Sequence, residues 1–242
     1  RRVLFRSLVS KDNATTLFSD EKQKRIIQSK AGFILEIADE LEQIINNTTI
    51  EYIYAHGVNQ KVLFSYNDKN DYMAQTLHDL MNEKIGNVEH EFICKWLNEF
   101  GLGEDYDVHS IGGEAYIIQI EDKSGKMVYL ADMGMGANQL VILILRLAII
   151  IHRHRICGNN VYRPTIVIEE PEQNMHPEYQ SKLATLFHEI HKTYGFNFIV
   201  ETHSEYLVRR SQVIVAHQKY NNDEELKSNN PFKVYYFPTD GQ

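Results

Sequence analysis

The sequence has 242 residues, of which 43% are hydrophobic and 24% are charged. This composition is ordinary for a globular protein with a buried core, and the length is enough for one large domain. The formal net charge of −8 argues against a generally basic nucleic-acid-binding protein. The two cysteines, Cys94 and Cys157, are too few for a disulfide framework, so we expect a reduced, cytoplasmic protein.

The sequence also argues against a membrane partner. The most apolar stretch, residues 140–151, is interrupted by Arg146 and is shorter than the ~20 residues that cross a bilayer. The N-terminus has neither the apolar segment nor the small-residue cleavage site of a secretory signal.

The N-terminal residues divide into two segments. Residues 1–7 match the translation of one frame of a common short-read sequencing adapter. We expect an artefact there, with the gene continuing upstream, and a native basic N-terminus is the alternative. Residues 8–48 are expected to form a helical arm or packing segment, because apolar residues recur at helical spacing across 20–47.

Short strands and one helix are predicted over the next part of the chain. Residues 50–55 and 61–66 are predicted strands around a turn at His56-Gly57. Residues 88–100 are predicted to form a helix that Gly101 ends. Strands over 116–121 and 127–130 are expected to form a hairpin around the turn 122–125.

The pattern then changes to that of a parallel α/β fold. Residues 138–154 are apolar on nearly every side, which predicts a buried helix. The β-branched run 165–168 is typical of a strand buried on both faces of a parallel sheet. A helix with apolar residues from Tyr179 to Ile190, a strand over 196–200 and a helix over 205–216 complete a βαβ pattern. A last strand is predicted over 233–237.

Acidic residues follow both of the buried strands. Glu169 and Glu170 end the first strand, and Glu201 with His203 ends the second. Ligands of open parallel sheets bind beyond the carboxyl ends of the strands, so these side chains predict a site. A Mg²⁺ nucleotide would offset their charge, whereas acids that simply leave the sheet for solvent are the plain alternative.

A glycine-containing segment, Asp132-Met133-Gly134-Met135-Gly136-Ala137-Asn138-Gln139, lies between a strand and the buried helix. Glycines at a helix N-terminus allow backbone N–H groups to approach an anion. A dinucleotide-binding fingerprint fails on spacing, because it requires glycine at Gln139.

Taken in order, three segments resemble the motifs of ABC-type ATPases. Residues 132–139 are similar to the signature, 166–177 to the Walker B strand with its D-loop, and 201–205 to the segment of the switch histidine. More narrowly, the run Glu-Glu-Pro-Glu…His-Pro followed by Glu-Thr-His-Ser-Glu resembles bacterial ATPases related to SMC proteins and to the OLD (overcoming lysogenization defect) family. The resemblance implies the C-terminal part of a P-loop NTPase lobe over 49–242, with a mostly parallel sheet and flanking helices.

The resemblance also implies a role for each matched residue. Glu170 would polarise the attacking water, His203 would touch the γ-phosphate of ATP, and Glu169 would lie near Mg²⁺. The nucleotide would be sandwiched in a homodimer and bound from the second subunit. The residues implied in that binding are Gly134, Gly136, Ala137, Asn138, Gln139, Asn174 and His176.

Two substitutions and one gap depart from the ABC pattern. Gly136 stands where the signature usually has serine, and Glu169 stands where Walker B usually has aspartate. The sequence contains no Gly-x-x-x-x-Gly-Lys-Ser/Thr loop, because its only Gly-Lys pair, Gly125-Lys126, has Met127 after it. We therefore expect a truncated ATPase that lacks its Walker A part, with a degenerate one as the alternative.

The function expected from these features is Mg²⁺-dependent ATP hydrolysis that drives a DNA-related or phage-defence partner activity. One alternative is the ATPase half of an OLD-type nuclease. Another is an interaction module that senses ATP without hydrolysing it. Cys94, beside the apolar face of its helix, is expected to be a packing residue.

Overall fold

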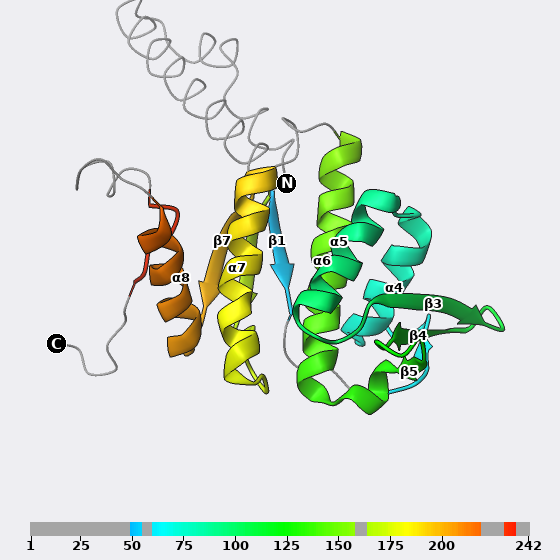
Figure 1. The fold of residues 1–242 in the computed structure, drawn as a ribbon. Coiled ribbons are helices and arrows are strands. Elements are labelled where there is room, and N and C mark those ends of the chain that lie inside the picture. The colour runs from blue at the N-terminus through cyan, green and yellow to red at the C-terminus, as the bar shows by residue number, and fades with distance from the viewer. Residues whose placement is uncertain (1–48, 55–59, 158–163, 219–229, 236–242) are drawn as a thin grey trace, which may run out of the picture. The chain divides into compact units, whose positions relative to one another are not determined.

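The computed structural model describes residues 49–54, 60–157, 164–218 and 230–235 (Figure 1). The predicted helix over 20–47, the turn at His56-Gly57 and residues 1–7 lie outside these ranges. Two sheets with helices between and beside them make up the described part, which confirms the α/β class.

The first sheet is parallel and has the order β1-β6-β7. Its strands are β1 (Ile50–Ile53), β6 (Thr165–Glu169) and β7 (Asn197–Glu201). The helix between β6 and β7 is α7 (Pro177–Tyr194), so the predicted βαβ unit is confirmed. After β7 comes α8 (Glu205–His217), which packs against α7.

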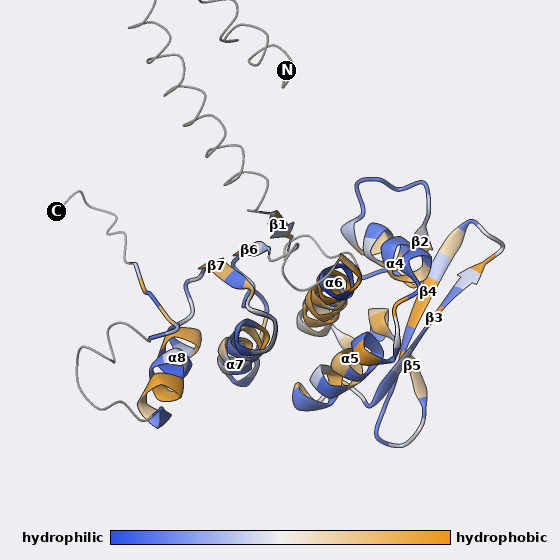
Figure 2. Ribbon diagram, turned by 90° about the horizontal axis from the view of Figure 1, so that it is seen from above, coloured by the Kyte–Doolittle hydropathy of each residue, from blue (hydrophilic) through white to orange (hydrophobic). Residues whose placement is uncertain are grey.

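The two faces of this sheet differ in burial. Ile166 and Ile168 of β6 are fully buried, and the intervening Val167 is only partly buried. Alternate residues of a strand point to opposite faces, and Figure 2 shows α7 on one side of β6 and β7. The prediction that β6 is buried on both faces is therefore wrong for the described residues. On the second face Tyr52 and Ile199 remain exposed.

The second sheet is antiparallel, with the order β2-β4-β3 and with β5 also paired to β4. Its strands are β2 (Phe64–Ser65), β3 (Asp105–Ile111), β4 (Ala115–Glu121) and β5 (Met127–Tyr129). The predicted β4–β5 hairpin is confirmed, and Asp122 stabilises its turn by accepting the N–H groups of Ser124 and Lys126. Strand β2 is shorter than the predicted 61–66.

Two helices pack beside this sheet. The predicted helix over 88–100 is α5 (Asn87–Glu99), and its apolar face is buried as expected. Helix α4 (Tyr72–Glu83) is absent from the sequence-based prediction. Its signals were present: Asp71 caps the helix by accepting the N–H groups of Met73 and Ala74, and Met73, Leu77 and Leu80 are buried at helical spacing.

Helix α6 (Met135–Cys157) forms the centre of the core and contacts both α4 and α5. It begins three residues before the predicted 138–154, directly after the short 3₁₀ helix η1 (Leu130–Met133). By length and composition alone α6 could cross a membrane, but 78% of its most apolar window is buried inside the fold. Arg146, the charged residue within the apolar run, pairs with Asp79 at 2.7 Å and lies over the Tyr72 ring. These contacts accommodate its charge beside the core.

The prediction of a last strand over 233–237 is not supported where it can be compared. Residues 233–235 have no strand conformation, and 236–237 lie outside the described residues. A short run of apolar and aromatic residues does not make a strand by itself, because a strand also needs a neighbour with which to exchange backbone hydrogen bonds.

Candidate active site

The acidic residues predicted at the strand ends do meet at one edge of the parallel sheet. Glu169 of β6 pairs in register with Glu201 of β7. The next residue, Glu170, donates its N–H to the carbonyl oxygen of Glu201 at 2.8 Å. The pairing therefore continues one residue beyond β6, and the chain then leaves the sheet.

Glu170 leaves the strand in an unusual backbone conformation, with φ at 40°. A residue with a side chain in this left-handed region carries strain of about 1–3 kcal/mol, and such residues concentrate at functional sites. The consequence here is that the side chain of Glu170 turns toward the end of β7.

His203 lies opposite that side chain. Its Nε2 is 3.3 Å from Oε1 of Glu170, and the His203 side chain is 79% exposed. Gln173 approaches the other carboxylate oxygen, with its Nε2 3.4 Å from Oε2 of Glu170. A solvent-facing carboxylate with an imidazole beside it is suited to orienting a water molecule and a bound anion.

Glu169 has a different partner, on the neighbouring strand. The hydroxyl of Tyr52 in β1 donates a hydrogen bond to the Glu169 carboxylate, and this bond, with burial and the carboxylate's charge, raises the pKa of Tyr52 to about 12. Tyr52 and Glu169 lie on the same open face of the sheet, because Tyr52 pairs with Val167, two residues before Glu169. The phenol therefore lies beside the carboxylate that the sequence assigned to Mg²⁺.

Glu172 connects the loop after β6 to the loop after β7, a role that the sequence analysis missed. It is 8% exposed, and its Oε1 accepts the backbone N–H of His203 at 2.6 Å. Its other oxygen, Oε2, is buried without a hydrogen-bond partner among the described residues. The signal in the sequence was a third acid, directly after Pro171, but the burial of that residue cannot be read from its spacing.

The glycine segment lies against the same loop. A Cβ atom on Gly136 would come within 2.6 Å of the carbonyl oxygen of Asn174. Only glycine fits this approach, which brings the first turn of α6 against residues 174–175. Gly134, with φ at 87°, makes the turn that leads into α6.

The residues that follow Gly136 in this segment differ from it in burial. Ala137, Asn138 and Gln139 are all buried. Asn138 Nδ2 donates to the carbonyls of Leu130 and Gly134, at 2.8 and 2.7 Å. Because α6 begins at Met135, the backbone N–H groups before Asn138 are the groups of its first turn that are available to an anion.

The two remaining site residues lie on the surface of the same loop. Asn174 is exposed and has φ at 58°. His176 is exposed and caps α7, its Nδ1 accepting the N–H of Glu178 at 3.3 Å. The structure thus places Gly134, Gly136, Asn174 and His176 around the loop that follows β6.

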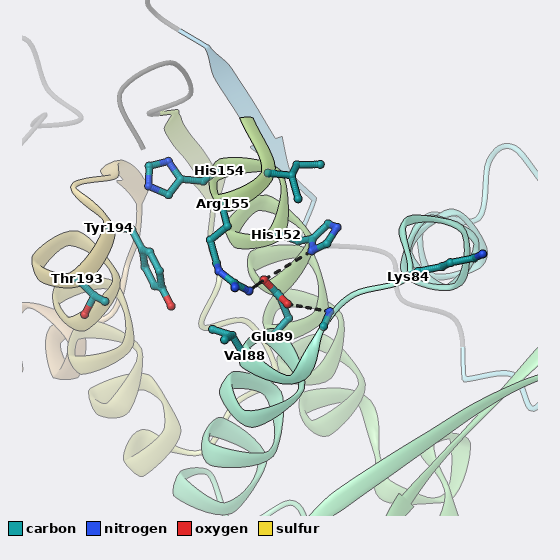
Figure 3. Close-up of a pocket in the computed structure, with 10 residues that line it drawn as sticks. Lys84, Val88, Glu89, His152, His154, Arg155, Thr193 and Tyr194 are labelled. Carbon is teal, nitrogen blue, oxygen red and sulfur yellow. Dashed lines mark hydrogen bonds and ion pairs between the residues drawn. The ribbon is translucent and has the colours of Figure 1, made fainter. Parts of the chain in front are cut away.

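A pocket of about 520 Å³ lies elsewhere (Figure 3). It is lined by the last turns of α6 and α7 and by residues between Lys84 and Glu89 at the start of α5, whereas the candidate site is at the first turns of α6 and α7. Helix α6 alone is about 34 Å long at 1.5 Å per residue, so the two places are well separated. The fully buried Glu89 beside the pocket accepts the Gly86 N–H and pairs with Arg155 at 2.5 Å, which gives it a structural role.

Comparison with known proteins decides the family. The family described as AAA ATPase domain matches residues 4–208. The chain belongs to this family. The AAA ATPase domain assignment covers η1, α6 and both acidic strand ends, which carry the candidate site.

Two further comparisons add less. The solved structures include an SMC head domain from Pyrococcus furiosus, with an extended coiled coil and bound to the C-terminal domain of ScpA. It is 13% identical, with a TM-score of 0.40, over 86% of this chain and 45% of that one. A TM-score of this size does not establish a shared fold, and the chain spans less than half of that relative. A search of curated proteins found no match to this chain.

Proposed function

We propose that this AAA ATPase domain hydrolyses ATP, with Glu170 and His203 as its catalytic residues. The observation that carries the proposal is the 3.3 Å approach of His203 Nε2 to Glu170 Oε1 at the carboxyl edge of the parallel sheet. The family assignment supports nucleotide binding. The strained backbone conformation of Glu170 at the end of β6 supports a functional role for that residue.

Each of these residues has a distinct task in the reaction. Glu170 accepts a hydrogen bond from the attacking water and takes its proton as the oxygen attacks the γ-phosphorus. The bond between the γ-phosphorus and the β–γ bridging oxygen breaks, and ADP and phosphate leave. His203 donates from its imidazole to the γ-phosphate, whose equatorial oxygens carry charge in the transition state.

A metal ion fits beside these residues. Glu169 offers a carboxylate oxygen, the donor that Mg²⁺ prefers, and Tyr52 holds that carboxylate in place as an outer-shell partner. Mg²⁺ bound there would neutralise charge on the β- and γ-phosphates. Glu201, exposed in register with Glu169, adds to the negative potential that attracts a cation.

We further propose that the nucleotide is shared between two copies of the chain. The first turn of α6 presents the backbone of Met135, Gly136 and Ala137, whereas the Asn138 N–H is bonded to the Gly134 carbonyl. Asn174 lies next to Gly136, and His176 follows in the same loop. The helix dipole and free N–H groups of such a turn favour a phosphate. The proposal requires a P-loop that holds the same nucleotide, and these 242 residues do not supply one.

The test is phosphate release by the protein from the full open reading frame, with the Glu170→Gln variant beside it. We expect Mg²⁺-dependent turnover that the variant lacks. The 242-residue chain alone should release no phosphate above the level of its own Glu170→Gln variant. Turnover by this chain alone would show that it holds ATP without a P-loop and that the shared-site architecture is wrong.

The output of hydrolysis is proposed from the resemblance to SMC and OLD proteins: a DNA-related or phage-defence activity, with DNA or a nuclease effector as partner. The second candidate is an ATP-sensing module that does not hydrolyse. The departures at Gly136 and Glu169 from the ABC pattern favour it. Dimerisation with ATP but without turnover would decide for the sensor.

A further inference from the structure

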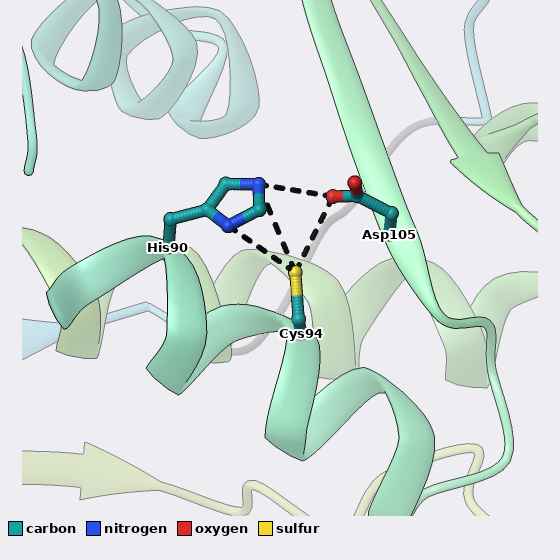
Figure 4. A group of neighbouring side chains, drawn as sticks. All are labelled: His90, Cys94 and Asp105. Atoms are coloured by element: carbon teal, nitrogen blue, oxygen red, sulfur yellow. Dashed lines mark hydrogen bonds and ion pairs between the residues drawn. The ribbon is translucent and has the colours of Figure 1, made fainter. Parts of the chain in front are cut away.

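Three potential metal ligands meet away from the ATP site, where α5 packs beside β3 (Figure 4). His90 and Cys94 are four residues apart in α5 and therefore lie on the same face of that helix. Asp105 is the first residue of β3. One ligand atom from each residue lies within 4.8 Å of the others.

The separations between these atoms are close to those around a tetrahedral zinc ion. With ordinary zinc bond lengths, nitrogen and oxygen ligands are about 3.3 Å apart, sulfur and oxygen about 3.5 Å, and sulfur and nitrogen about 3.6 Å. Here His90 Nε2 is 3.0 Å from Asp105 Oδ1, and Cys94 Sγ is 3.3 Å from the same oxygen. The sulfur is 3.8 Å from Nε2 and 3.7 Å from Nδ1 of the imidazole, so a rotation of the His90 ring is needed to point Nε2 at an ion shared with Cys94 and Asp105.

A catalytic cysteine does not explain this cluster. Burial and the hydrogen bond to Asp105 raise the pKa of the Cys94 thiol to about 12, whereas a nucleophilic cysteine needs a lowered pKa. The expectation that Cys94 is a packing residue is also incomplete, because its sulfur contacts two polar side chains. A divalent cation would replace the thiol proton and offset both negative charges.

The surroundings resemble the outer shell of a metal site. Asp105 Oδ1 accepts the N–H of Tyr106 at 2.7 Å, which fixes the carboxylate. The ring of Tyr106 stacks on His90, with 5.4 Å between ring centroids and 30° between planes, which fixes the imidazole. The side chains of His90 and Asp105 are 47% and 45% exposed, so an ion and a water ligand can reach them.

We propose that His90, Cys94 and Asp105 bind one Zn²⁺ ion, with water as the fourth ligand. Sulfur, imidazole and carboxylate together are a donor set that suits zinc better than Mg²⁺ or Ca²⁺. The ion joins the middle of α5 to the start of β3. Its binding is independent of ATP.

The chain offers matched controls for a direct test. Its second cysteine, Cys157, is exposed at the end of α6, so Cys157→Ser controls for Cys94→Ser. His109 also lies beside a carboxylate, with its Nδ1 3.1 Å from Oδ2 of Asp107. No cysteine takes part in that pair among the described residues, so His109→Ala controls for His90→Ala. Any purification tag that contains histidines has to be removed first.

The experiment measures zinc retained after gel filtration in metal-free buffer, and the thiolate–Co²⁺ absorption band after cobalt substitution. We expect one ion per chain and the cobalt band in the wild type and in both controls. Cys94→Ser should lose the band, and it and His90→Ala should bind zinc at least ~10-fold more weakly. Zinc should raise the melting temperature of the controls but not of these two variants.

The inference is overturned by any of three results: no retained zinc in the wild type, no cobalt band, or a band that Cys157→Ser removes as fully as Cys94→Ser. Asp105→Asn provides a further check, since it keeps the shape of the side chain and a hydrogen-bond acceptor. If Asp105→Asn binds zinc as tightly as the wild type, the carboxylate is not a ligand. None of these measurements depends on ATP hydrolysis.

Discussion

His203 Nε2 and Glu170 Oε1 lie 3.3 Å apart, each just beyond the end of a different strand of the parallel sheet. The register between β6 and β7 produces this pair, because Glu169 lies opposite Glu201 and both chains continue past the sheet edge in the same direction. The two residues are therefore placed by backbone hydrogen bonds, and their side chains are free to act on a ligand.

Glu170→Gln should lower turnover of the full protein by about 10²–10⁴-fold, the usual contribution of a positioned general base. Glutamine is nearly isosteric, so ATP binding should survive and the ATP-bound dimer should last longer. Phosphate release and size-exclusion chromatography with ATP measure the two effects. Glu178→Gln, an exposed change at the start of α7, is the control. Wild-type turnover in Glu170→Gln would assign the base to another residue, with Glu169 as the first candidate.

His203→Ala should slow turnover by about 10²-fold, because it removes a donor to the γ-phosphate. In contrast to Glu170→Gln, it should make the ATP-dependent dimer shorter-lived. The same two assays separate the variants. His217→Ala, at the end of α8, controls for the loss of an imidazole. A more persistent dimer in His203→Ala would contradict the γ-phosphate contact.

Glu169→Gln should raise the Mg²⁺ concentration needed for half-maximal turnover, since an amide is a weaker ligand than a carboxylate. Tyr52→Phe, which removes only the hydroxyl held by Glu169, should raise it by about 10–100-fold, as for other outer-shell partners. Tyr54→Phe, a change directly after the end of β1, is the control. A magnesium titration of phosphate release is the measurement. If Tyr52→Phe leaves the titration unchanged, the tyrosine does not position Glu169.

Glu172→Ala should increase the mobility of the His203 segment, because the buried acceptor of the His203 N–H is lost. Losing a hydrogen bond to a charged group costs about 1.5–3 kcal/mol. Hydrogen exchange of the His203 amide should become faster, and turnover should fall. Glu172→Gln keeps an acceptor and should recover most of both.

A double variant separates positioning from general destabilisation. If Glu172 acts through His203, Glu172→Ala should lower turnover less in a His203→Ala background than in the wild type. Equal losses in both backgrounds would show that Glu172 contributes only to stability.

Gly136→Ala should destabilise the domain by about 1–3 kcal/mol, the usual range for an overpacked contact. The added methyl group would come within 2.6 Å of the Asn174 carbonyl, and backbone there cannot move aside cheaply. Urea unfolding of the wild type and the variant gives the difference. Gly113→Ala, which adds its methyl group in open space, shows how much a strained backbone alone costs. No loss of stability in Gly136→Ala would mean that the loop at Asn174 adapts.

The sequence by itself determined the α/β class, the position of the acids at the sheet edge, and the burial of α5 and α6. These features follow from local periodicity and from the rule that parallel strands share one carboxyl edge. Helix α4 was equally readable from its Asp71 cap and its spacing. The second, open face of β6 was not, because a run of apolar residues does not show what covers it.

Only the tertiary structure decided which groups meet. The bond from Glu172 to the His203 N–H, the approach of Gly136 to Asn174, and the convergence of His90, Cys94 and Asp105 each join segments that are separate in the chain. It also placed the side chains of Asn138 and Gln139 inside the core, against the expectation from their motif. Local pattern specifies an element and its apolar face, whereas the packing of one loop against another depends on the whole arrangement of the fold.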